Sequence, residues 1–393
     1  MARGVSRLAF DAVEQLTNLV EAMHANIGAA PLPLGEGTDG RTRGVTGFVY
    51  HSIRFVNAAA RAALDGGLAL LAEGGEPALP RPRSDALLSA LNGVLGDYLE
   101  ESGNPLAIPM QLRRGGEALP LERAGLAAAH PGASGKLLVL VHGSCMNDRQ
   151  WTRNGHDHGA ALGRDLGYTP LYLLYNSGRH VSENGRELAA LLEALVAAWP
   201  TPVQEFVILG HSMGGLVARS ACQQGAEAGH VWLRRLGKLA FLGTPHHGAP
   251  LERGGSWIDL LLGVSPYSAP LARLGMIRSA GITDLRYGNV LEADWRDRDR
   301  FARGGDRRTA APLPAGVTCY ALAATLGRGR SDLNARLLGD GLVPLDSALG
   351  HHADPSKRLR IPDSQCWVGP GMGHFDLLDS HEAYQQLRAW LEA

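Results

Sequence analysis

The sequence predicts an α/β protein built on a mostly parallel central sheet with helices on both sides. Short apolar runs, the first at residues 136–141, are typical of strands that are buried on both faces. Segments with helical periodicity, such as residues 183–199 and 213–224, separate several of these runs. Strands that alternate with helices pair in parallel through right-handed crossovers, so one parallel sheet accounts for both observations.

The individual strands are expected where apolar runs end in turn residues. Gly115 and Gly116 separate two alternating segments, which predicts a hairpin with Leu112 opposite Leu119 if its turn has two residues. The parallel strands are expected at residues 136–141, 171–175, 206–209, 239–242, 317–323 and 365–368.

The chain is expected to divide into a helical N-terminal region, residues 1–104, and an α/β domain, residues 105–393. The first region shows helical periodicity and ends at an Asn-Pro pair. Within the second, no strand is evident over residues 246–312, although strands are expected on both sides. We therefore expect residues 246–312 to form a lid or cap inserted over one end of the sheet.

Composition and charge exclude several classes of protein. The 393 residues carry a formal net charge of -1 and no basic tail, so nucleic-acid binding is not expected. No uncharged apolar run reaches about 18 residues, so no transmembrane helix is expected, while peripheral membrane contact stays open. The N-terminus lacks the apolar core of a signal peptide, which favours a cytoplasmic protein with its four cysteines reduced. No feature indicates an oligomeric state.

Ser212 is the strongest candidate for a catalytic group. It stands in the run Gly-His-Ser-Met-Gly at residues 210–214, between the apolar run at residues 206–209 and a helical segment. A strand, a sharp turn and a helix around G-x-S-x-G form a nucleophile elbow, whose crowded turn needs small residues at both ends. This context predicts a serine nucleophile at the edge of an α/β-hydrolase sheet.

Acyl transfer at such a serine requires N–H donors for the negative charge that develops on the carbonyl oxygen. The backbone amide of Met213, directly after the nucleophile, is one expected donor. The run Val-His-Gly-Ser at residues 141–144 follows the first parallel strand and is expected to supply the other. Ser144 is favoured there over Cys145, and His142 is expected to shape the loop.

The base and its acid are expected late in the chain, because the order in this fold is serine, acid, histidine. His374 is favoured because glycines precede it in a short loop after the last strand. The competing histidines are His351, His352 and His381. Asp340, which follows the strand near residue 323, is the favoured acid because a carboxylate there could orient the imidazole. The competing carboxylates are Asp332, Asp346, Asp354 and Asp363.

Four motifs resemble bacterial triacylglycerol lipases and esterases of the α/β-hydrolase superfamily, most of all the branch similar to GPI inositol-deacylases. They are Gly-His-Ser-Met-Gly-Gly-Leu-Val-Ala-Arg at 210–219, Phe-Leu-Gly-Thr-Pro-His-His-Gly at 241–248, Gly-Asp-Gly-Leu-Val-Pro at 339–344 and Gly-His-Phe-Asp-Leu-Leu at 373–378. The resemblance covers about residues 105–393. It implies a catalytic domain of this fold, with Ser212, Asp340 and His374 as its triad.

The resemblance also implies that Ser144 and Met213 form the oxyanion hole and that residues 244–248 line the site entrance. The insertion that follows would be a lid or an acyl-chain pocket. The residues expected to contact substrate are His142, His246, Trp257 and Leu261. No cofactor is expected, and no metal either, because the histidine pairs at 156–158 and 246–247 lack a full ligand set.

Together these features predict a serine-dependent carboxylic ester hydrolase, an esterase or lipase that forms an acyl-enzyme with a small-molecule or lipid ester. A thioesterase, amidase or acyltransferase on the same triad is an alternative. So is a non-catalytic interaction protein that works through its N-terminal helices. The motifs do not specify the acyl chain or the leaving group.

Overall fold

The structure is a computed structural model of the chain and describes residues 2–28, 54, 58, 81–249, 279–298, 306–327 and 339–393. The chain forms two compact units. The first holds the described residues up to Pro80 together with Leu99–Ala107, and the second holds Arg81–Tyr98 and the described residues from Ile108 onward. The domain boundary at residue 104 stays a prediction; residues 81–98 belong to the unit that contains the sheet.

The first unit contains helix α1 (Ala2–Gly28), where the apolar periodicity of the sequence predicts a helix. Nδ2 of Asn104 donates a hydrogen bond of 3.2 Å to the carbonyl oxygen of Gly4, and Leu106 is buried beside it. Of residues 29–80 in the expected helical region, the structure describes only positions 54 and 58.

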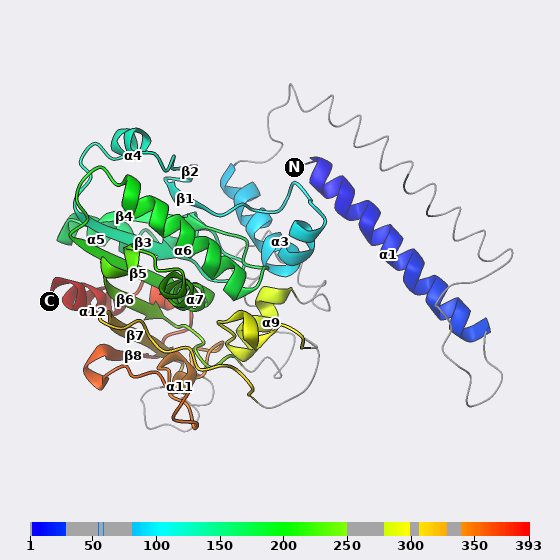
Figure 1. Ribbon diagram of the computed structural model, residues 1–393. Helices are drawn as coiled ribbons and strands as arrows, with labels where there is room; N and C mark the ends of the chain where they lie inside the picture. Colours follow the sequence, from blue (N-terminus) through cyan, green and yellow to red (C-terminus); the bar gives the residue numbers. More distant parts are fainter. Residues whose placement is uncertain are drawn as a thin grey trace. The chain divides into compact units, whose positions relative to one another are not determined.

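The second unit is built around one eight-stranded sheet (Figure 1). Its strands lie in the order β2-β1-β4-β3-β5-β6-β7-β8. Strands β3 to β8 are parallel, and β1 pairs antiparallel with β2 and β4. The strands are β1 (Gln111–Arg114), β2 (Glu117–Ala118), β3 (Lys136–Val141), β4 (Thr169–Leu174), β5 (Glu205–His211), β6 (Leu236–Leu242), β7 (Thr318–Thr325) and β8 (Cys366–Pro370). The predicted mostly parallel sheet is confirmed.

Helices cover both faces of this sheet (Figure 1). Helices α6 (Val181–Ala198) and α7 (Met213–Glu227) pack on one face, and α5 (His158–Leu166) and α12 (His381–Glu392) pack on the other. The other helices are α3 (Arg81–Glu101), α4 (Arg123–Ala129), α9 (Ala280–Tyr287) and α11 (Leu345–Ala348). The short 3-10 helices are Asp148–Trp151, Trp232–Arg234, Glu292–Asp294, Asp363–Gln365 and Asp376–Leu378. None of the described helices is both long and apolar enough to cross a membrane.

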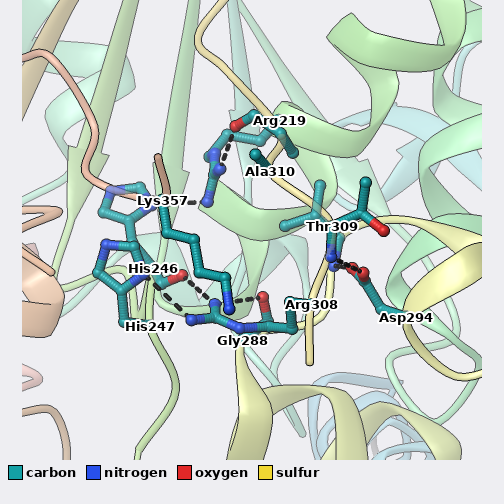
Figure 2. Close-up of a pocket in the computed structure, with 11 residues that line it drawn as sticks. Arg219, His246, His247, Gly288, Asp294, Arg308, Thr309, Ala310 and Lys357 are labelled. Carbon is teal, nitrogen blue, oxygen red and sulfur yellow. Dashed lines mark hydrogen bonds between the residues drawn. The ribbon is translucent and has the colours of Figure 1, made fainter. Parts of the chain in front are cut away.

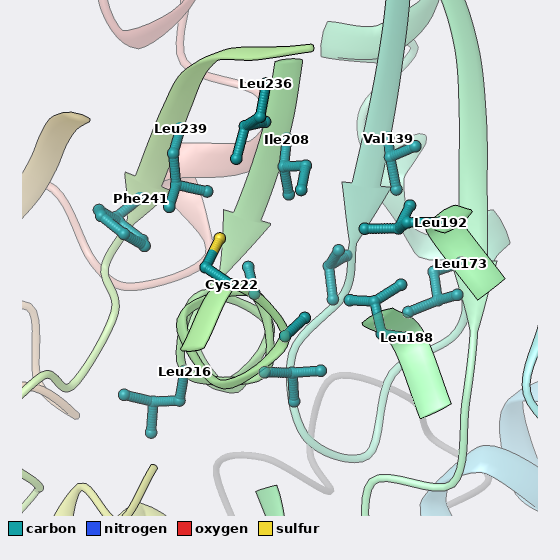
Figure 3. Close-up of a cluster of buried hydrophobic side chains, with 14 of the residues drawn as sticks. Val139, Leu173, Leu188, Leu192, Ile208, Leu216, Cys222, Leu236, Leu239 and Phe241 are labelled. Carbon is teal, nitrogen blue, oxygen red and sulfur yellow. The ribbon is translucent and has the colours of Figure 1, made fainter. Parts of the chain in front are cut away.

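The central strands are mostly apolar because both of their faces are covered. In β3, Leu137 and Val139 face the core beneath α6 and α7, whereas Leu138 and Leu140 face the core beneath α5 and α12. Figure 3 shows side chains of α6, α7 and the strands meeting in the first of these cores. Each such buried side chain stabilises the fold by about 1.5–3 kcal/mol relative to an exposed one.

Strands β1 and β2 form the predicted hairpin. The amide of Leu119 donates to the carbonyl oxygen of Leu112 at 2.8 Å, so these two residues are opposite each other. The turn between the strands consists of Gly115 and Gly116, whose φ values are +59° and +84°. A type I′ turn requires positive φ at both central residues, which explains the glycine pair.

A buried carboxylate of α9 ties this helix to the start of α6. Oδ2 of Asp284 accepts a hydrogen bond from the amide of Val181 at 2.8 Å and lies 2.9 Å from Nδ1 of His180. Oδ1 accepts from Nδ2 of Asn289 at 2.8 Å. An anion at a helix N-terminus satisfies an unpaired amide and interacts favourably with the helix dipole. Helix α9, which belongs to the expected insertion, is therefore fixed to α6, a helix that packs on the sheet.

We expect Asp284→Ala to lower the free energy of unfolding by about 2–4 kcal/mol, because the amides of Val181 and Asn289 would lose their buried acceptor. Urea unfolding followed by circular dichroism measures the change. Asp363→Ala removes an exposed carboxylate and should change the value by less than about 0.5 kcal/mol. Equal losses in the two variants would contradict a capping role for Asp284.

Candidate active site

Ser212 occupies a sharp turn between β5 and α7. Its backbone has φ 53° and ψ -123°, a strained conformation for a residue with a side chain, and its amide donates to the carbonyl oxygen of Leu242 at 2.8 Å. The turn is crowded: a Cβ on Gly214 would lie 2.1 Å from the carbonyl oxygen of Val141. A Cβ on Gly210 would lie 2.7 Å from the backbone of Gly215. The strand, strained turn and helix have the geometry of a nucleophile elbow.

Asp340 and His374 form a buried pair. Oδ2 of Asp340 lies 2.7 Å from Nδ1 of His374, and both side chains are only 1% exposed. The other carboxylate oxygen accepts from the amides of Leu342 and Val343 at 2.9 and 2.8 Å. Because an ionised carboxylate only accepts, Nδ1 of His374 carries the proton and Nε2 has a free lone pair in the neutral ring. Nε2 has no hydrogen-bond partner among the residues that the structure describes.

The ring of His374 lies beside the elbow. A Cβ on Gly243 would be 3.0 Å from Cε1 and Nδ1 of His374, and Gly243 follows the residue that accepts from the amide of Ser212. The ring centroids of His211 and His374 are 4.8 Å apart. The structure therefore brings the three residues of the expected triad to one edge of the sheet. It records no hydrogen bond between Ser212 and His374, a contact that often tightens only when substrate is bound.

The loop after β3 contacts the elbow directly. A Cβ on Gly143 would lie 3.1 Å from Cβ of Ser212. The amide of Cys145 already donates to Oγ of Ser177 at 3.0 Å, so this amide is engaged elsewhere. The amides of Ser144 and Met213 have no acceptor in the described part of the chain. Of the two loop residues considered from the sequence, Ser144 is thus the one with an amide available for an oxyanion.

The competing histidines and carboxylates lie in other contacts. Nδ1 of His351 is 3.5 Å from Oδ1 of Asp346, Nε2 of His352 is 3.1 Å from Asp306, and His381 is an exposed first residue of α12. The remaining carboxylates considered from the sequence are the exposed Asp354 and Asp363, and Asp332, which lies outside the described residues. None of those that are described contacts the ring of His374.

Two of the expected substrate contacts are fully buried histidines. His142 stacks on Tyr175 with ring centroids 4.3 Å apart, and its Nδ1 lies 2.8 Å from the carbonyl oxygen of Gly143, so it shapes the loop after β3. His246 packs edge-on against Phe241 and contacts Arg219 of α7. Trp257 and Leu261 lie outside the described residues.

Helix α3 packs on the same loop, a contact that no motif in the sequence indicates. A Cβ on Gly93 would lie 2.2 Å from Sγ of Cys145 and 2.9 Å from its Cα. Oγ of Ser279 donates to the carbonyl oxygen of Gly93 at 2.7 Å. A glycine that contacts a distant loop leaves no periodic pattern in the sequence. Ser177, whose Oγ accepts from the amide of Cys145 in this loop, also belongs to no motif.

Among the described residues, no group of three or more His, Cys, Asp or Glu side chains is arranged to hold a metal ion.

Burial controls the charge of the histidines around the elbow. It lowers the pKa of His142 to about 4, although the hydrogen bond to Gly143 opposes this shift. Burial and the nearby His374 hold the pKa of His211 well below 6.5. Both rings are therefore neutral at pH 7.

We expect the protein to lose stability as the pH falls below about 6.5 towards 4, because the unfolded chain then binds protons that the buried rings do not. For His142 this contribution is fully present above pH 6.5. His142→Asn should flatten the dependence of the unfolding free energy on pH by up to about 1.4 kcal/mol per pH unit. Urea unfolding at pH 5 to 7.5 measures this slope. His381→Asn, at an exposed position, is the control, and an equal flattening there would contradict the assignment.

Part of the chain is similar to a known family of alpha/beta domains. Residues 132–309 match the family model of the PGAP1-like alpha/beta domain, a span that includes Ser144 and Ser212 and ends before Asp340. No curated protein sequence matches the chain. The family match confirms the resemblance to α/β hydrolases that the motifs indicate.

Similar solved structures include lipases and an esterase. The mature lipase BlEst2 of Bacillus licheniformis is 19% identical over 65% of this chain and 91% of its own, with a TM-score of 0.42. Aspergillus fumigatus lipase B is 13% identical over 69% of this chain and 58% of its own, with a TM-score of 0.40. The Pyrococcus furiosus esterase Pf2001 is 13% identical over 67% and 82%, with a TM-score of 0.39. From its own sheet order and the elbow after β5, this chain has the α/β-hydrolase fold, and residues 132–309 are similar to the PGAP1-like alpha/beta domain.

Proposed function

We propose that the protein hydrolyses carboxylic esters of small-molecule or lipid substrates through an acyl-enzyme on Ser212. The buried contact of 2.7 Å between Asp340 and His374, which leaves Nε2 free beside the elbow, carries this proposal. A serine next to a free imidazole nitrogen that a carboxylate orients is the arrangement that serine hydrolases use.

In the first step, Nε2 of His374 takes the proton of Ser212 while Oγ attacks the ester carbonyl carbon. The carbonyl π electrons move to oxygen, and the amides of Ser144 and Met213 donate to this oxyanion. Asp340 stabilises the imidazolium. When the oxyanion collapses, the alkoxide leaves with the proton of the imidazolium, and Ser212 remains acylated.

In the second step, water attacks the acyl carbon while Nε2 takes one of its protons. The second tetrahedral intermediate collapses, the carboxylic acid departs, and Ser212 recovers its proton from His374. The first turn of α7 is the positive end of the helix dipole, and this end faces the oxyanion in the proposed complex. We also propose that residues 246–312 cover the entrance to this site, and that His142 and His246 contact the substrate there.

In this proposal, helix α3 supports the loop after β3, which carries the amide of Ser144 and is called the oxyanion loop below. Nδ2 of Asn176 donates to the carbonyl oxygen of Gly96 at 2.9 Å, and the amide of Ala280 donates to Oδ2 of Asp97 at 2.8 Å. The loop after β4 and the start of α9 therefore both hold the helix whose Gly93 contacts Cys145. The position of the neighbouring Ser144 amide would then depend on a helix that precedes the matched family segment.

Ser212→Ala should abolish turnover of nitrophenyl esters, with kcat lower by roughly 10⁴-fold or more, and should abolish covalent labelling by a fluorophosphonate. A chain-length series of these esters, run beside thioester and amide substrates, identifies the preferred acyl chain and leaving group. Labelling that persists in Ser212→Ala would overturn the nucleophile. Turnover of thioesters or amides without esters would favour the related acyl-transfer chemistries.

Asp340→Asn should lower kcat by about 10⁴-fold with little change in the folded structure, because the amide would favour the wrong tautomer of His374. Steady-state kinetics on a nitrophenyl ester measures the loss. Asp346→Asn changes a carboxylate six residues away that contacts His351, and should leave kcat within about twofold. A similar loss in both variants would argue against Asp340 as the orienting acid.

Gly93→Ala should lower kcat by about 10- to 100-fold with a smaller change in KM, because the added methyl would push the Cys145 backbone and displace the oxyanion donor beside it. Cys145→Ala in the same chain removes the nearest atom and should restore part of the loss. Gly132→Ala, where a Cβ meets nothing within 4 Å, is the control. A change in KM alone, or no rescue, would contradict the supporting role of α3.

A further inference from the structure

The histidines outside the proposed triad differ in what their rings contact. His246 faces Arg219 in a small pocket, with 3.4 Å between Nδ1 of the ring and Nη1 of the guanidinium (Figure 2). His158, the first residue of α5, instead contacts the backbone of residues 373–378, called the histidine loop below because it carries His374. His158 takes no part in the proposed reaction steps, but it contacts the loop that holds their base.

A buried hydrogen bond joins α5 to the histidine loop. Nε2 of His158 lies 2.9 Å from the carbonyl oxygen of Leu377, and both residues are fully buried. A Cβ on Gly243 would lie 3.1 Å from Cδ1 of Leu377 and 3.0 Å from Nδ1 of His374. The carbonyl group that His158 binds therefore belongs to a residue whose side chain lies beside the imidazole of His374.

The contacts of His158 determine which ring nitrogen carries its proton. Because a carbonyl oxygen only accepts, Nε2 carries the proton and donates to Leu377. Nδ1 then has a lone pair and accepts from Nε2 of His156, which lies 2.8 Å away. Burial lowers the pKa of His158 to about 4, although the hydrogen bond to Leu377 opposes this shift, so the ring is neutral at pH 7. A neutral ring with this one proton makes both hydrogen bonds.

The start of α5 holds His158 in a fixed position. Oδ1 of Asp157 accepts from the amide of Ala160 at 2.8 Å and thereby caps the helix. The same oxygen accepts from the hydroxyl of Tyr172 in β4 at 2.7 Å. The ring of Tyr384 in α12 stacks on the ring of His158, with centroids 5.8 Å apart. Contacts with the sheet and with a second helix therefore hold the donor in place.

The turn before α5 contacts the end of the histidine loop. The backbones of Arg153 and His156 exchange two hydrogen bonds of 2.8 Å, which close this turn. Nδ2 of Asn154 donates to Oδ2 of Asp379 at 2.5 Å, and Nε of Arg153 lies 3.4 Å from the same oxygen. Residues 153–158 therefore hold the chain after His374 at two places, Leu377 and Asp379.

We propose that His158 is a positioning residue for His374, and that it acts by donating from Nε2 to the carbonyl oxygen of Leu377. The inference rests on the proposed function, in which His374 is the base. Asp340 orients the ring of His374, whereas His158 fixes the backbone three residues further along. Without this donor the carbonyl group of Leu377 would be buried without its partner, so the loop would move. A displacement of about 1 Å in a catalytic group can lower the rate by about 100-fold.

Two substitutions of His158 separate the hydrogen bond from packing. His158→Phe keeps an aromatic ring against Tyr384 but cannot donate to Leu377, whereas His158→Gln loses the ring and keeps an N–H at the corresponding position. We expect His158→Phe to lower kcat on a nitrophenyl ester by about 10- to 100-fold with KM within about twofold, and His158→Gln to stay within about fivefold of wild type. Active sites titrated with a fluorophosphonate give the rate per folded molecule. The reverse order of the two variants would overturn the proposal.

Proton NMR tests the same contact without an ester substrate. The proton between Nδ1 of His374 and Asp340 should give a downfield signal, which Asp340→Asn identifies by its loss. We expect His158→Phe to shift or broaden this signal and His158→Gln to leave it as in wild type. His130→Phe, which removes another buried histidine in contact with Arg114, is the matched control and should change neither the signal nor kcat. An unchanged signal in His158→Phe would overturn the proposal.

A measurement on wild type requires no variant to fold. Nitrogen-15 spectra of labelled histidine should show His158 protonated on Nε2 alone at pH 7. A proton on Nδ1 instead would leave no donor for Leu377 and would overturn the proposal. If wild type lacks ester turnover while the signal of His374 still depends on the donor at position 158, the proposed function fails and the positioning of His374 by His158 is supported.

Discussion

The close approach of α7 to the end of β3 is the contact on which the rest of the site depends. Gly214 lies so near the carbonyl oxygens of Val141 and His142 that a Cβ would be 2.1 and 2.6 Å from them. This approach holds Ser212 at a φ of 53°, a strain of about 1–3 kcal/mol that the buried surroundings must sustain.

Several consequences follow from this one contact. It brings the loop after β3 against Ser212, so the amides of Ser144 and Met213 come from two elements that are in direct contact. It also fixes the direction of α7, and with it the position of Arg219 two turns further along the helix.

The central sheet was predictable because its physical cause is local in the sequence. Each strand from β3 to β7 is covered on both faces, so it contains a short apolar run, and helices of clear periodicity separate several of these runs. The hairpin was predictable for another local reason, since Gly115 and Gly116 both need positive φ. The strand order was not predictable from the runs alone, because it depends on contacts between segments far apart in the chain.

The residues of the candidate site also differ in whether their cause is local in the sequence or a contact between distant segments. Gly-x-Ser-x-Gly is a local requirement of a crowded turn, so Ser212 could be selected from its neighbours. Asp340 could only be ranked among other aspartates, because what distinguishes it is a contact across 34 residues with His374. The contact of α3 with the oxyanion loop leaves no signal in the sequence. It rests on the absence of a side chain at Gly93, which looks like any other glycine in a helix.

The histidines around the elbow show how the fold selects one base among several imidazoles. His142 and His211 are as deeply buried as His374, and burial keeps both neutral because no described carboxylate lies at hydrogen-bond distance from either ring. A catalytic base must gain a proton inside this same environment of low polarity. Only a ring with a carboxylate at hydrogen-bond distance can do so without a large cost, and among these three that ring is His374, through Asp340.

The selection therefore rests on where the fold places a single carboxylate. The amides of Leu342 and Val343 hold one oxygen of Asp340 and leave the other for Nδ1 of His374. An ionised carboxylate that accepts several amides is itself stabilised in a buried position. The turn at residues 339–344 thus supplies the charge that the imidazolium needs, and the neighbouring histidines, which have no such turn, are left to pack and to shape the loops.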